Sequence, residues 1–377
     1  MSTLLKERAF WFAWSQIQGL GPILQKRLAL HFGSLEAAWE ASTKRLQQVE
    51  GIGIKLTEAI AQQRPQLNPE ATLTQAVPFL TPADEAYPTL LYEISDPPPV
   101  LYYQGNLDLL KACQTATGVG IVGTRGPSEY GRRWTRRLTK TLSRAGFLII
   151  SGLADGIDRI AHQSCLEVKG HTIAVLGTGT DVVYPYRNRD LYGAIADAGL
   201  LLSEYPPGTQ PDRVNFPRRN RIIAGLSRAI LVTEAPRKSG ALITAHLAND
   251  YGRDVFALPG SLDNPRCHGC LALVNQGAQL ILEEQTLIDA LGGIPVERSA
   301  KPQTNQLTIL NPLPDLNPPL KQVFQAISEE AKTLDAIVKH SGDLSTGEVL
   351  SALVQLELMG LVSQLPGMQY QRCLHPE

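Results

Sequence analysis

The stretch that decides the fold is GVGIVGTRGPSEYGRRWTRRLTKTLSRAGFLIISG, residues 118–152. It begins with a short apolar run at 119–122, and a second apolar run follows at 147–150. Between them, Trp134, Leu138 and Leu142 recur at every fourth residue, which is the spacing of one face of an α-helix. A strand, a helix and a second strand in this order predict two parallel strands with the helix packed on their sheet.

The same alternation continues to about residue 291, with helical segments such as 241–249 between most of the apolar runs. The further runs cover residues 172–176, 200–202, 229–232, 254–258 and 279–282. We therefore expect an α/β fold over residues 66–292: an extended Rossmann-like, doubly wound parallel sheet with helices on both faces. In the first part of this domain, three prolines at 97–99 lead into an extended segment, 100–103, that should form a strand.

Residues 1–65 contain a weak internal repeat of a glycine turn. Gly19-Leu-Gly-Pro22 recurs as Gly51-Ile-Gly-Ile54, and a helical pattern follows each copy. This arrangement is typical of a helix-hairpin-helix (SAM-like) domain, in which free N–H groups at a helix start meet a phosphate. It suits equally a helical module whose glycine turns pack tightly. Only three cations lie close to the turns, so we expect low DNA affinity: Lys26, Arg27 and Lys55.

The C-terminal part predicts a linker and a small domain. Residues 293–317 are rich in proline and read as a linker, and residues 318–377 read as three helices and a hairpin turning at Pro366-Gly367, the order of a winged helix. Ser345-Thr-Gly-Glu348 is a capping box that opens the third helix. That helix carries Glu348 and Glu357 but no Lys or Arg, so we expect it to contact protein rather than a DNA groove.

Composition excludes several classes of protein. The chain has 377 residues, 43% of them apolar, and a net charge of −1, so nucleic-acid binding would have to come from a local patch. No apolar run approaches the ~18 residues of a membrane span, and we expect a cytoplasmic protein without membrane contact. Cys267-His-Gly-Cys270 has the spacing of metal ligands, but no second pair accompanies it. We interpret these cysteines as small loop residues and expect neither a metal nor another cofactor.

The strongest local charge surrounds Phe216-Pro-Arg-Arg-Asn-Arg221, here called the basic cluster. Between Arg213 and Lys238 lie seven basic residues and one acid, Glu234, a local net charge of 7 − 1 = +6. Because the cluster contains a proline and an asparagine, we expect it in a turn rather than along a helix. Such an excess predicts an anionic ligand, and Phe216 would offer a flat surface to a base.

Ligands of doubly wound sheets bind beyond the carboxyl ends of the strands. Small residues and turn-forming residues follow nearly every predicted strand, which favours a phosphate-sized cavity. They are Gly123-Thr-Arg125, Ser151-Gly152, Gly177-Thr-Gly179, Ser203-Glu204, Ser239-Gly240 and Pro259-Gly260. We expect Arg125 to hold a phosphate beside the helix start near Pro127-Ser128, and Lys238 with Ser239-Gly240 to form a second cradle of backbone amides.

Two other chemistries are disfavoured. Gly118 to Gly123 match GxGxxG, yet the first two glycines fall within the predicted strand and only Gly123 lies at the turn after it, which argues against NAD or FAD. Asp158 and His162 lie one turn apart on a predicted helix, where capping and core roles are commoner than catalysis. Because the chain also lacks a nucleophile–base pair and a Walker motif, we expect no enzymatic activity.

With this fold in place, five motifs resemble the DNA-processing protein A family (DprA, also called Smf), in the family's order. They are Gly120-Ile-Val-Gly-Thr-Arg125, Ser151-Gly-Leu-Ala-Asp-Gly-Ile-Asp158, Ser203-Glu-Tyr-Pro206, Phe216-Pro-Arg-Arg-Asn-Arg-Ile-Ile-Ala-Gly-Leu-Ser227 and Ser239-Gly-Ala-Leu-Ile-Thr-Ala245. The resemblance covers roughly residues 80–290, and the helical start and winged-helix end suit the family's three-domain form.

The resemblance implies a non-enzymatic protein of natural transformation that binds incoming single-stranded DNA, forms a homodimer through the Rossmann-like domain and helps to load the RecA recombinase. It implies a DNA pocket, to which the basic cluster adds Asn220 and Arg221. The implied residues are Gly123, Arg125, Ser151, Gly152, Arg213, Phe216, Lys238, Ser239 and Gly240. If about four phosphates are neutralised, affinity should fall with salt at a log–log slope near −3.

Two alternatives remain open. A nucleotide phosphoribohydrolase of related fold would need a PGGxGTxxE segment, but residues 239–245 and 259–261 lack its glycine pair and following glutamate. A pure protein scaffold would bind no DNA. Titration with DNA separates the scaffold from the leading hypothesis, and release of base from nucleoside monophosphates would identify the enzyme.

Overall fold

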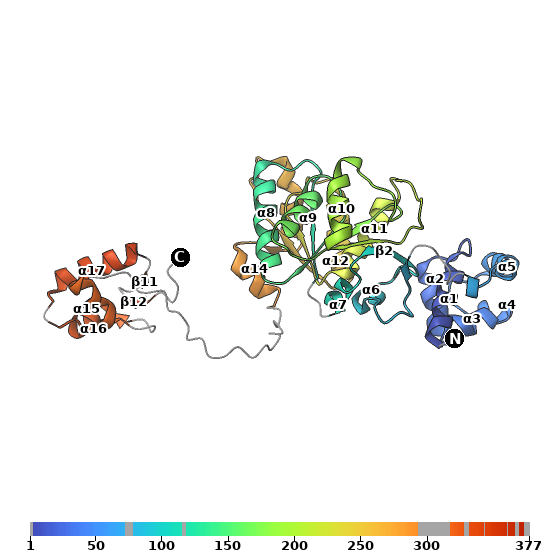
Figure 1. Ribbon diagram of the computed structural model, residues 1–377, viewed down its shortest axis with the longest axis horizontal. Coiled ribbons are helices and arrows are strands. Elements are labelled where there is room, and N and C mark those ends of the chain that lie inside the picture. Colours follow the sequence, from blue (N-terminus) through green and yellow to red (C-terminus); the bar gives the residue numbers. More distant parts are fainter. Residues whose placement is uncertain are drawn as a thin grey trace. The chain divides into compact units, whose positions relative to one another are not determined.

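A computed structural model describes residues 3–71, 78–114, 118–292, 317–327, 332–342, 344–359, 361–365 and 369–372. The chain divides into two compact units, Met1–Glu297 and Arg298–Glu377 (Figure 1). Within the described residues, no helix is both long enough and apolar enough to cross a membrane.

The larger unit is built on a sheet of nine described strands in the order β1-β2-β6-β5-β4-β3-β7-β8-β9. From β6 to β9 all neighbours are parallel, whereas β2 is antiparallel to β6 and β1 is antiparallel to β2. The strands are β1 (Phe79–Leu80), β2 (Leu101–Gly105), β3 (Gly118–Val122), β4 (Leu148–Ser151), β5 (Thr172–Leu176), β6 (Leu200–Ser203), β7 (Ala229–Val232), β8 (Asp254–Ala257) and β9 (Gln279–Leu280). Each predicted apolar run contains one strand, so the expected fold class is confirmed.

Helices cover both faces of the sheet (Figure 1). On one face lie α8 (Glu129–Arg144), α9 (Ile157–Glu167), α10 (Arg189–Ala198) and α14 (Glu284–Ala290). On the other lie α6 (Thr89–Glu93), α7 (Leu109–Gln114), α11 (Asn215–Leu226), α12 (Gly240–Asp250) and α13 (His268–Asn275). Because both faces are covered, every residue of β3 to β7 is buried, which is why these strands appear in the sequence as unbroken apolar runs.

Strand β3 is the switch point of the sheet. The chain leaves it through α8, adds β4, β5 and β6 on one side, and returns through α11 to place β7 on the other side. A crevice therefore opens at the carboxyl ends of β3 and β7. The first two GxGxxG glycines belong to β3, and only Gly123 follows it: a Cβ on Gly120 would lie 2.3 Å from Cδ1 of Ile230.

The basic cluster lies on a helix, so the expectation of a turn is wrong. Residues Asn215–Leu226 form α11, and Pro217 is its third residue. The first four N–H groups of a helix have no intrahelical acceptor, so a proline here removes no hydrogen bond. The helix therefore tolerates a residue that suggested a break.

The first five helices share a core around Trp14 and pack beside α6. Gly19 and Gly51 have φ of +89° and +91°, so each turn uses the left-handed region that favours glycine. The Nζ atom of Lys26 donates to the carbonyl oxygens of Tyr92 (2.7 Å) and Ile94 (2.9 Å), and Arg27 donates to that of Glu50. These bonds favour the packing role of the glycine turns; a separate domain ending at residue 65 stays a prediction. The helices are α1 (Thr3–Ser15), α2 (Pro22–Phe32), α3 (Leu35–Glu40), α4 (Thr43–Leu46) and α5 (Ile54–Gln63).

The smaller unit has the expected winged-helix order. Ser345 and Glu348 form the predicted capping box: the Ser345 hydroxyl accepts from the Glu348 N–H, and the Glu348 carboxylate accepts from the Ser345 N–H. Residues 293–316 of the predicted linker and the turn at Pro366-Gly367 lie outside the described residues. The elements are α15 (Pro318–Ala326), β10 (Lys332–Thr333), α16 (Leu334–His340), α17 (Thr346–Leu358), β11 (Val362–Leu365) and β12 (Gln369–Arg372).

His162 makes the stability of the larger unit depend on pH. Its imidazole is wholly buried on α9, and its Nδ1 lies 2.7 Å from the Thr172 hydroxyl, which itself donates to the Ile149 carbonyl oxygen. Burial lowers the pKa of His162 from 6.5 to about 3. The unfolded chain therefore takes up this proton near pH 6.5, while the folded protein does not until about pH 3. Stability is lost as pH falls through that window.

We predict that His162→Gln flattens the fall in the free energy of unfolding between pH 6.5 and pH 4, because His162 contributes up to about 1.4 kcal/mol per pH unit there. Urea unfolding followed by tryptophan fluorescence measures the slope. His246→Gln, at an exposed site on α12, should keep the wild-type slope. Equal slopes for wild type and His162→Gln would contradict the prediction.

Candidate functional site

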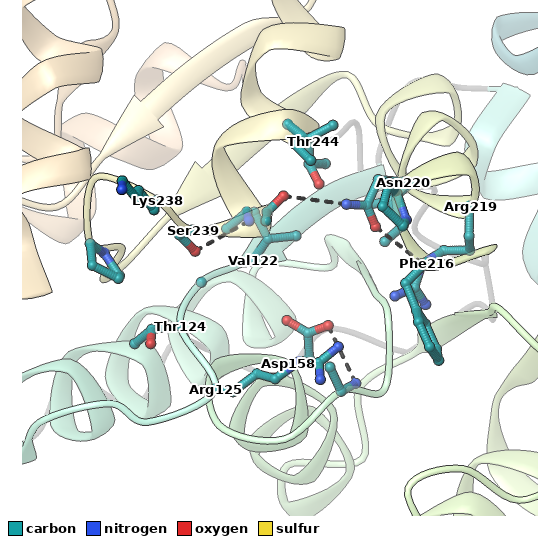
Figure 2. A pocket seen from close by; sticks show the side chains of 18 of the residues that line it. Val122, Thr124, Arg125, Asp158, Phe216, Arg219, Asn220, Lys238, Ser239 and Thr244 are labelled. Atoms are coloured by element: carbon teal, nitrogen blue, oxygen red, sulfur yellow. Dashed lines mark hydrogen bonds between the residues drawn. The ribbon is translucent and has the colours of Figure 1, made fainter. Parts of the chain in front are cut away.

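A cavity of about 620 Å³ occupies the crevice at the carboxyl ends of β3 and β7. Five segments meet there: the loop from β3 to α8, the start of α9, the loop after β5, the start of α11, and the loop from β7 to α12. Figure 2 shows Lys238 and Ser239 on one side, Phe216 and Asn220 on the other, and Arg125 below them. The structure therefore brings together residues separated by more than a hundred positions in the chain.

Helix α11 lines the cavity with one face. Phe216, Arg219, Asn220 and Ile223 all contribute, at the i, i+3, i+4, i+7 spacing of a helix face. Arg221 comes two residues after Arg219, so it points to the opposite side of the helix. This geometry decides which residues of the basic cluster reach a ligand.

Three exposed cations line the cavity: Arg125, Arg213 and Lys238. No carboxylate in the described part of the chain lies within 4.0 Å of any of them. Their charge is therefore available to an anion. Arg237 is also exposed but does not line the cavity.

The first turn of α12 opens into the cavity. Ser239 is its N-cap, with a hydroxyl that accepts from the Ala241 N–H at 3.3 Å, and Gly240 is the first helical residue. A Cβ on Gly240 would meet nothing within 4 Å, so a ligand can approach this backbone closely. The Asn220 amide donates to the Gly240 carbonyl oxygen (3.4 Å) and so ties α11 to α12 (Figure 2). The predicted cradle at Lys238, Ser239 and Gly240 is therefore part of the cavity.

The other predicted cradle, at the start of α8, is already filled by Glu234. Its carboxylate accepts from the Ser128 N–H at 2.7 Å and from the Ser128 hydroxyl at 2.6 Å. A negative charge at this helix N-terminus takes the place that we had expected for a phosphate beside Pro127-Ser128. Arg125 thus faces the cavity without help from α8.

Phe216 forms an aromatic pair that the sequence did not suggest. Its ring stacks on Tyr184, with centroids 5.3 Å apart and planes at 30°, and the Arg125 guanidinium carbon lies 5.8 Å from the Phe216 centroid. A Cβ on Gly177 would lie 2.8 Å from the ring, so this glycine makes room for Phe216. Tyr184 is itself exposed and lines the cavity. In the sequence, only the Tyr184-Pro185 pair after the turn at 177–179 could have drawn attention to this residue.

Arg219 forms the floor of the cavity, a role that our sequence analysis missed. Its buried guanidinium donates to the carbonyl oxygen of Gly152 at 2.7 Å and to that of Val175, at the ends of β4 and β5. Burial lowers the pKa of Arg219 to about 10, and the neighbouring Asp158 partly offsets this. Burial likewise raises the pKa of Asp158, while Arg219 and the N–H groups of Ala154 and Gly152 oppose the rise.

Three predicted site residues have structural roles. Ser151 is wholly buried, and its hydroxyl donates to the Ile121 carbonyl oxygen at 2.6 Å, away from the cavity. Gly152 provides space for Arg219, because a Cβ there would lie 2.4 Å from the guanidinium. Gly123 does line the cavity, but its lack of a side chain serves packing: a Cβ would lie 2.5 Å from Ile157. The Gly152 N–H is not open to a ligand either, because it donates to the Asp158 carboxylate at 3.1 Å.

Arg221 is also misassigned as a ligand-binding residue. Its guanidinium is buried between two carboxylates, at 3.0 Å from Asp96 and 2.6 Å from Glu204. Burial opposes its charge, but these partners outweigh burial and raise the pKa of Arg221. Burial raises the pKa of Glu204, and the contact with Arg221 opposes that rise. Arg221 therefore neutralises two partly buried acids.

Cys267 and Cys270 are both buried beside the end of β7. Burial raises the pKa of Cys270 to about 12, which keeps its thiol protonated at neutral pH. Among the described residues, no group of three or more His, Cys, Asp or Glu side chains is placed to hold a metal ion.

A doubly wound sheet with unpaired cations and an open helix start at its switch point defines a Rossmann-like protein with a candidate site for phosphate groups. Comparison with known protein families identifies the family within this class. The model of the DNA recombination-mediator protein A family matches residues 78–292, and that of the DprA winged helix domain matches residues 310–368. The chain belongs to the DNA recombination-mediator protein A (DprA/Smf) family.

Individual relatives support this family assignment. Protein Smf of Synechocystis sp. is 52% identical over 394 aligned positions, covering 97% of this chain and 99% of the relative. A solved structure of DprA from Streptococcus pneumoniae has 36% identity and a TM-score of 0.66, covering 74% of this chain and 97% of that one. A second structure concerns the single-stranded DNA binding mode of DNA processing protein A from Helicobacter pylori; it has 34% identity, a TM-score of 0.52, and covers 57% of this chain and 96% of that one.

We predict that Arg221→Met lowers the free energy of unfolding by about 3–5 kcal/mol, because Glu204, whose side chain is only 14% exposed, loses its cation. Chemical denaturation measures this loss. Arg218→Met, at an exposed position on the same helix, should cost less than about 0.5 kcal/mol. Adding Glu204→Gln and Asp96→Asn to Arg221→Met should restore part of the loss. An Arg221→Met protein as stable as wild type would refute the structural role.

Proposed function

We propose that this chain binds single-stranded DNA in the cavity at the switch point, without preference for base sequence, as a non-catalytic recombination mediator. One observation carries the proposal: three unpaired cations, an open helix start and an aromatic pair with one exposed ring, that of Tyr184, line the same cavity. The cations and the amides suit phosphates, while the aromatic rings suit bases.

The phosphate contacts would come from Arg125 on one side and from Lys238 and Gly240 on the other, with Arg213 at the rim. Arg219 adds positive charge from the floor, because no carboxylate of the described residues lies within 4.0 Å of its guanidinium. Because Arg221 is paired with Asp96 and Glu204, only three exposed cations remain to contact phosphates. At about 0.7 per phosphate on a single strand, the expected log–log salt slope becomes about −2.

The aromatic pair favours a single strand over a duplex. Tyr184 and Phe216 line a recessed cavity, and only an unpaired base can turn out of its stack to reach such rings. A base that continues the stack on Tyr184 would contribute about 1–3 kcal/mol whatever its identity. Stacking of this kind accounts for binding without sequence preference.

The relatives support this assignment. The Helicobacter pylori protein whose structure concerns single-stranded DNA binding shares this fold at 34% identity. Participation in natural transformation and delivery of the strand to RecA are further parts of the proposal, and they rest on family membership.

We predict that Arg125→Ala/Lys238→Ala weakens binding to oligo-dT about 100-fold, because each lost charge-assisted contact contributes about 1.5 kcal/mol. Fluorescence anisotropy measures affinity, and the salt slope should shrink from about −2 to about −0.7. Arg237→Ala removes an exposed charge next to Lys238 but outside the cavity lining, so its effect should be small. The double variant should also fail to promote RecA assembly on the strand.

Three results would contradict the proposal: an Arg237→Ala loss as large as that of the double variant, tighter binding of duplex than of oligo-dT, or a salt slope near zero. Release of base from nucleoside monophosphates would instead favour the phosphoribohydrolase alternative. A protein that binds no DNA at all would favour a scaffold.

A homodimer through the Rossmann-like domain is also part of the proposal. Strand β9 lies at the edge of the sheet, where unpaired backbone groups are free to meet another chain. Leu280 (40% exposed) and Leu282 (74%) place apolar surface in this strand and just after it. Exposed leucines around an edge strand are typical of a covered interface.

We predict that Leu280→Arg/Leu282→Arg converts the dimer to a monomer, because burying two cations in the interface is unfavourable. Size-exclusion chromatography with light scattering measures the mass. Leu30→Arg, at a residue 67% exposed on α2, should leave the mass unchanged. A monomeric wild type, or a dimer that survives the double variant, would argue against an interface at β9.

A further inference from the structure

A second cationic surface lies on α8, outside the cavity. Its residues are spaced three or four apart and so form one stripe along the helix, here called the α8 stripe. It consists of Arg133, Arg136, Arg137, Lys140 and Arg144. Together with Glu284 of α14 they line a hollow of about 420 Å³.

Carboxylates neutralise only part of this stripe. Glu284 holds Arg137 through two hydrogen bonds (2.8 and 2.9 Å), and Glu167 pairs with Lys140 at 2.9 Å. Five cations less two acids leave a net charge of 5 − 2 = +3. Among the described residues, no carboxylate lies within 4.0 Å of Arg133, Arg136 or Arg144.

These charges do little to stabilise the helix itself. Arg133 and Arg137, Arg136 and Lys140, and Lys140 and Arg144 are like-charged neighbours four residues apart, an arrangement that destabilises a helix. The helix dipole favours cations only in the last turn, which explains Arg144 but not Arg133 or Arg136. An anion bound along the stripe would relieve this repulsion.

Aromatic rings orient two of the guanidinium groups. The Arg137 guanidinium carbon lies 5.2 Å from the centroid of the half-buried Trp134, and that of Arg133 lies 6.0 Å from the centroid of Tyr130. A planar guanidinium supported by a ring keeps its N–H groups in a fixed fork, the geometry that holds a phosphate through two hydrogen bonds. Glu284 already takes two N–H groups of Arg137, so Arg133 is the ring-supported guanidinium that is open to a phosphate.

The surface chemistry favours nucleic acid over protein as the occupant. None of the exposed large hydrophobic side chains lies on α8, whereas protein interfaces usually have an apolar centre. Interfaces with nucleic acid are polar and strongly positive instead. The stripe therefore matches a phosphate backbone.

Its position connects it with the cavity. Helix α8 begins at Glu129, four residues after Arg125, and the stripe then extends for eleven residues, or about 16 Å at 1.5 Å per residue. We infer that the α8 stripe binds the backbone of the same single strand that occupies the cavity, after the strand has left it. This inference rests on the proposed function, and it assigns a longer path to the strand.

The test replaces two stripe residues that have no ion-pair partner, Arg136→Glu/Arg144→Glu, both exposed. Binding is measured with oligo-dT of about 8 and of about 40 nucleotides, of which only the longer can fill both surfaces. We expect affinity for the longer strand to fall about 10-fold or more and affinity for the shorter strand to stay within about twofold. Lys321→Glu/Lys339→Glu, which changes net charge equally in the smaller unit, should leave both affinities within that range.

Each other outcome overturns the inference. An unchanged affinity for the longer strand would remove the stripe from the path and leave the cavity as the binding site. Equal losses for both lengths, or an equal loss in the control variant, would indicate general electrostatic attraction. A loss confined to duplex binding would identify a different occupant. A wild-type protein that binds neither strand would refute the proposed function itself, and with it the stripe.

Discussion

The buried guanidinium of Arg219 is the interaction on which the candidate site depends. By donating to the carbonyl oxygens of Gly152 and Val175, it joins the start of α11 to the ends of β4 and β5. This bridge places Phe216 and Asn220 at the mouth of the cavity, and it explains why residue 152 has no side chain. It also leaves a positive charge beneath the site. One arginine thus fixes the shape of the cavity and adds to the positive potential of its three exposed cations.

The sequence predicts the sheet well and the site only in part, for physical reasons. Strands buried on both faces leave continuous apolar runs, so the strand at 229–232 could be recognised from composition alone. The basic cluster was harder, because Pro217 resembles a helix breaker although it lies in the first turn of α11. Once this segment is helical, Arg219 and Arg221 point in opposite directions. The error about Arg221 followed from that single error about secondary structure.

Other residues escaped because their partners are remote in the chain. Tyr184 meets Phe216 only after α10 and β6 have brought the chain back across the sheet. The Glu234 carboxylate reaches the start of α8 from the end of β7, 106 residues away. The α8 stripe was not predicted either, and its acidic neighbours Glu167 and Glu284 come from other helices. Local sequence patterns therefore identify single helices and strands, whereas the residues of a site are known only once the order of the strands and helices in the fold is known.

The loop that carries Arg125 is fastened along its length. The Thr124 N–H donates to the Glu234 carbonyl oxygen at 2.7 Å, the Gly126 carbonyl oxygen accepts from Arg266 at 3.1 Å, and Ser128 is held by Glu234. Only the Arg125 side chain is then left to become ordered when a ligand arrives, at a cost of about 0.5–1.5 kcal/mol. The backbone entropy of this loop was already lost on folding. Association at the cavity should therefore resemble docking onto a rigid surface, with little coupled rearrangement of the protein.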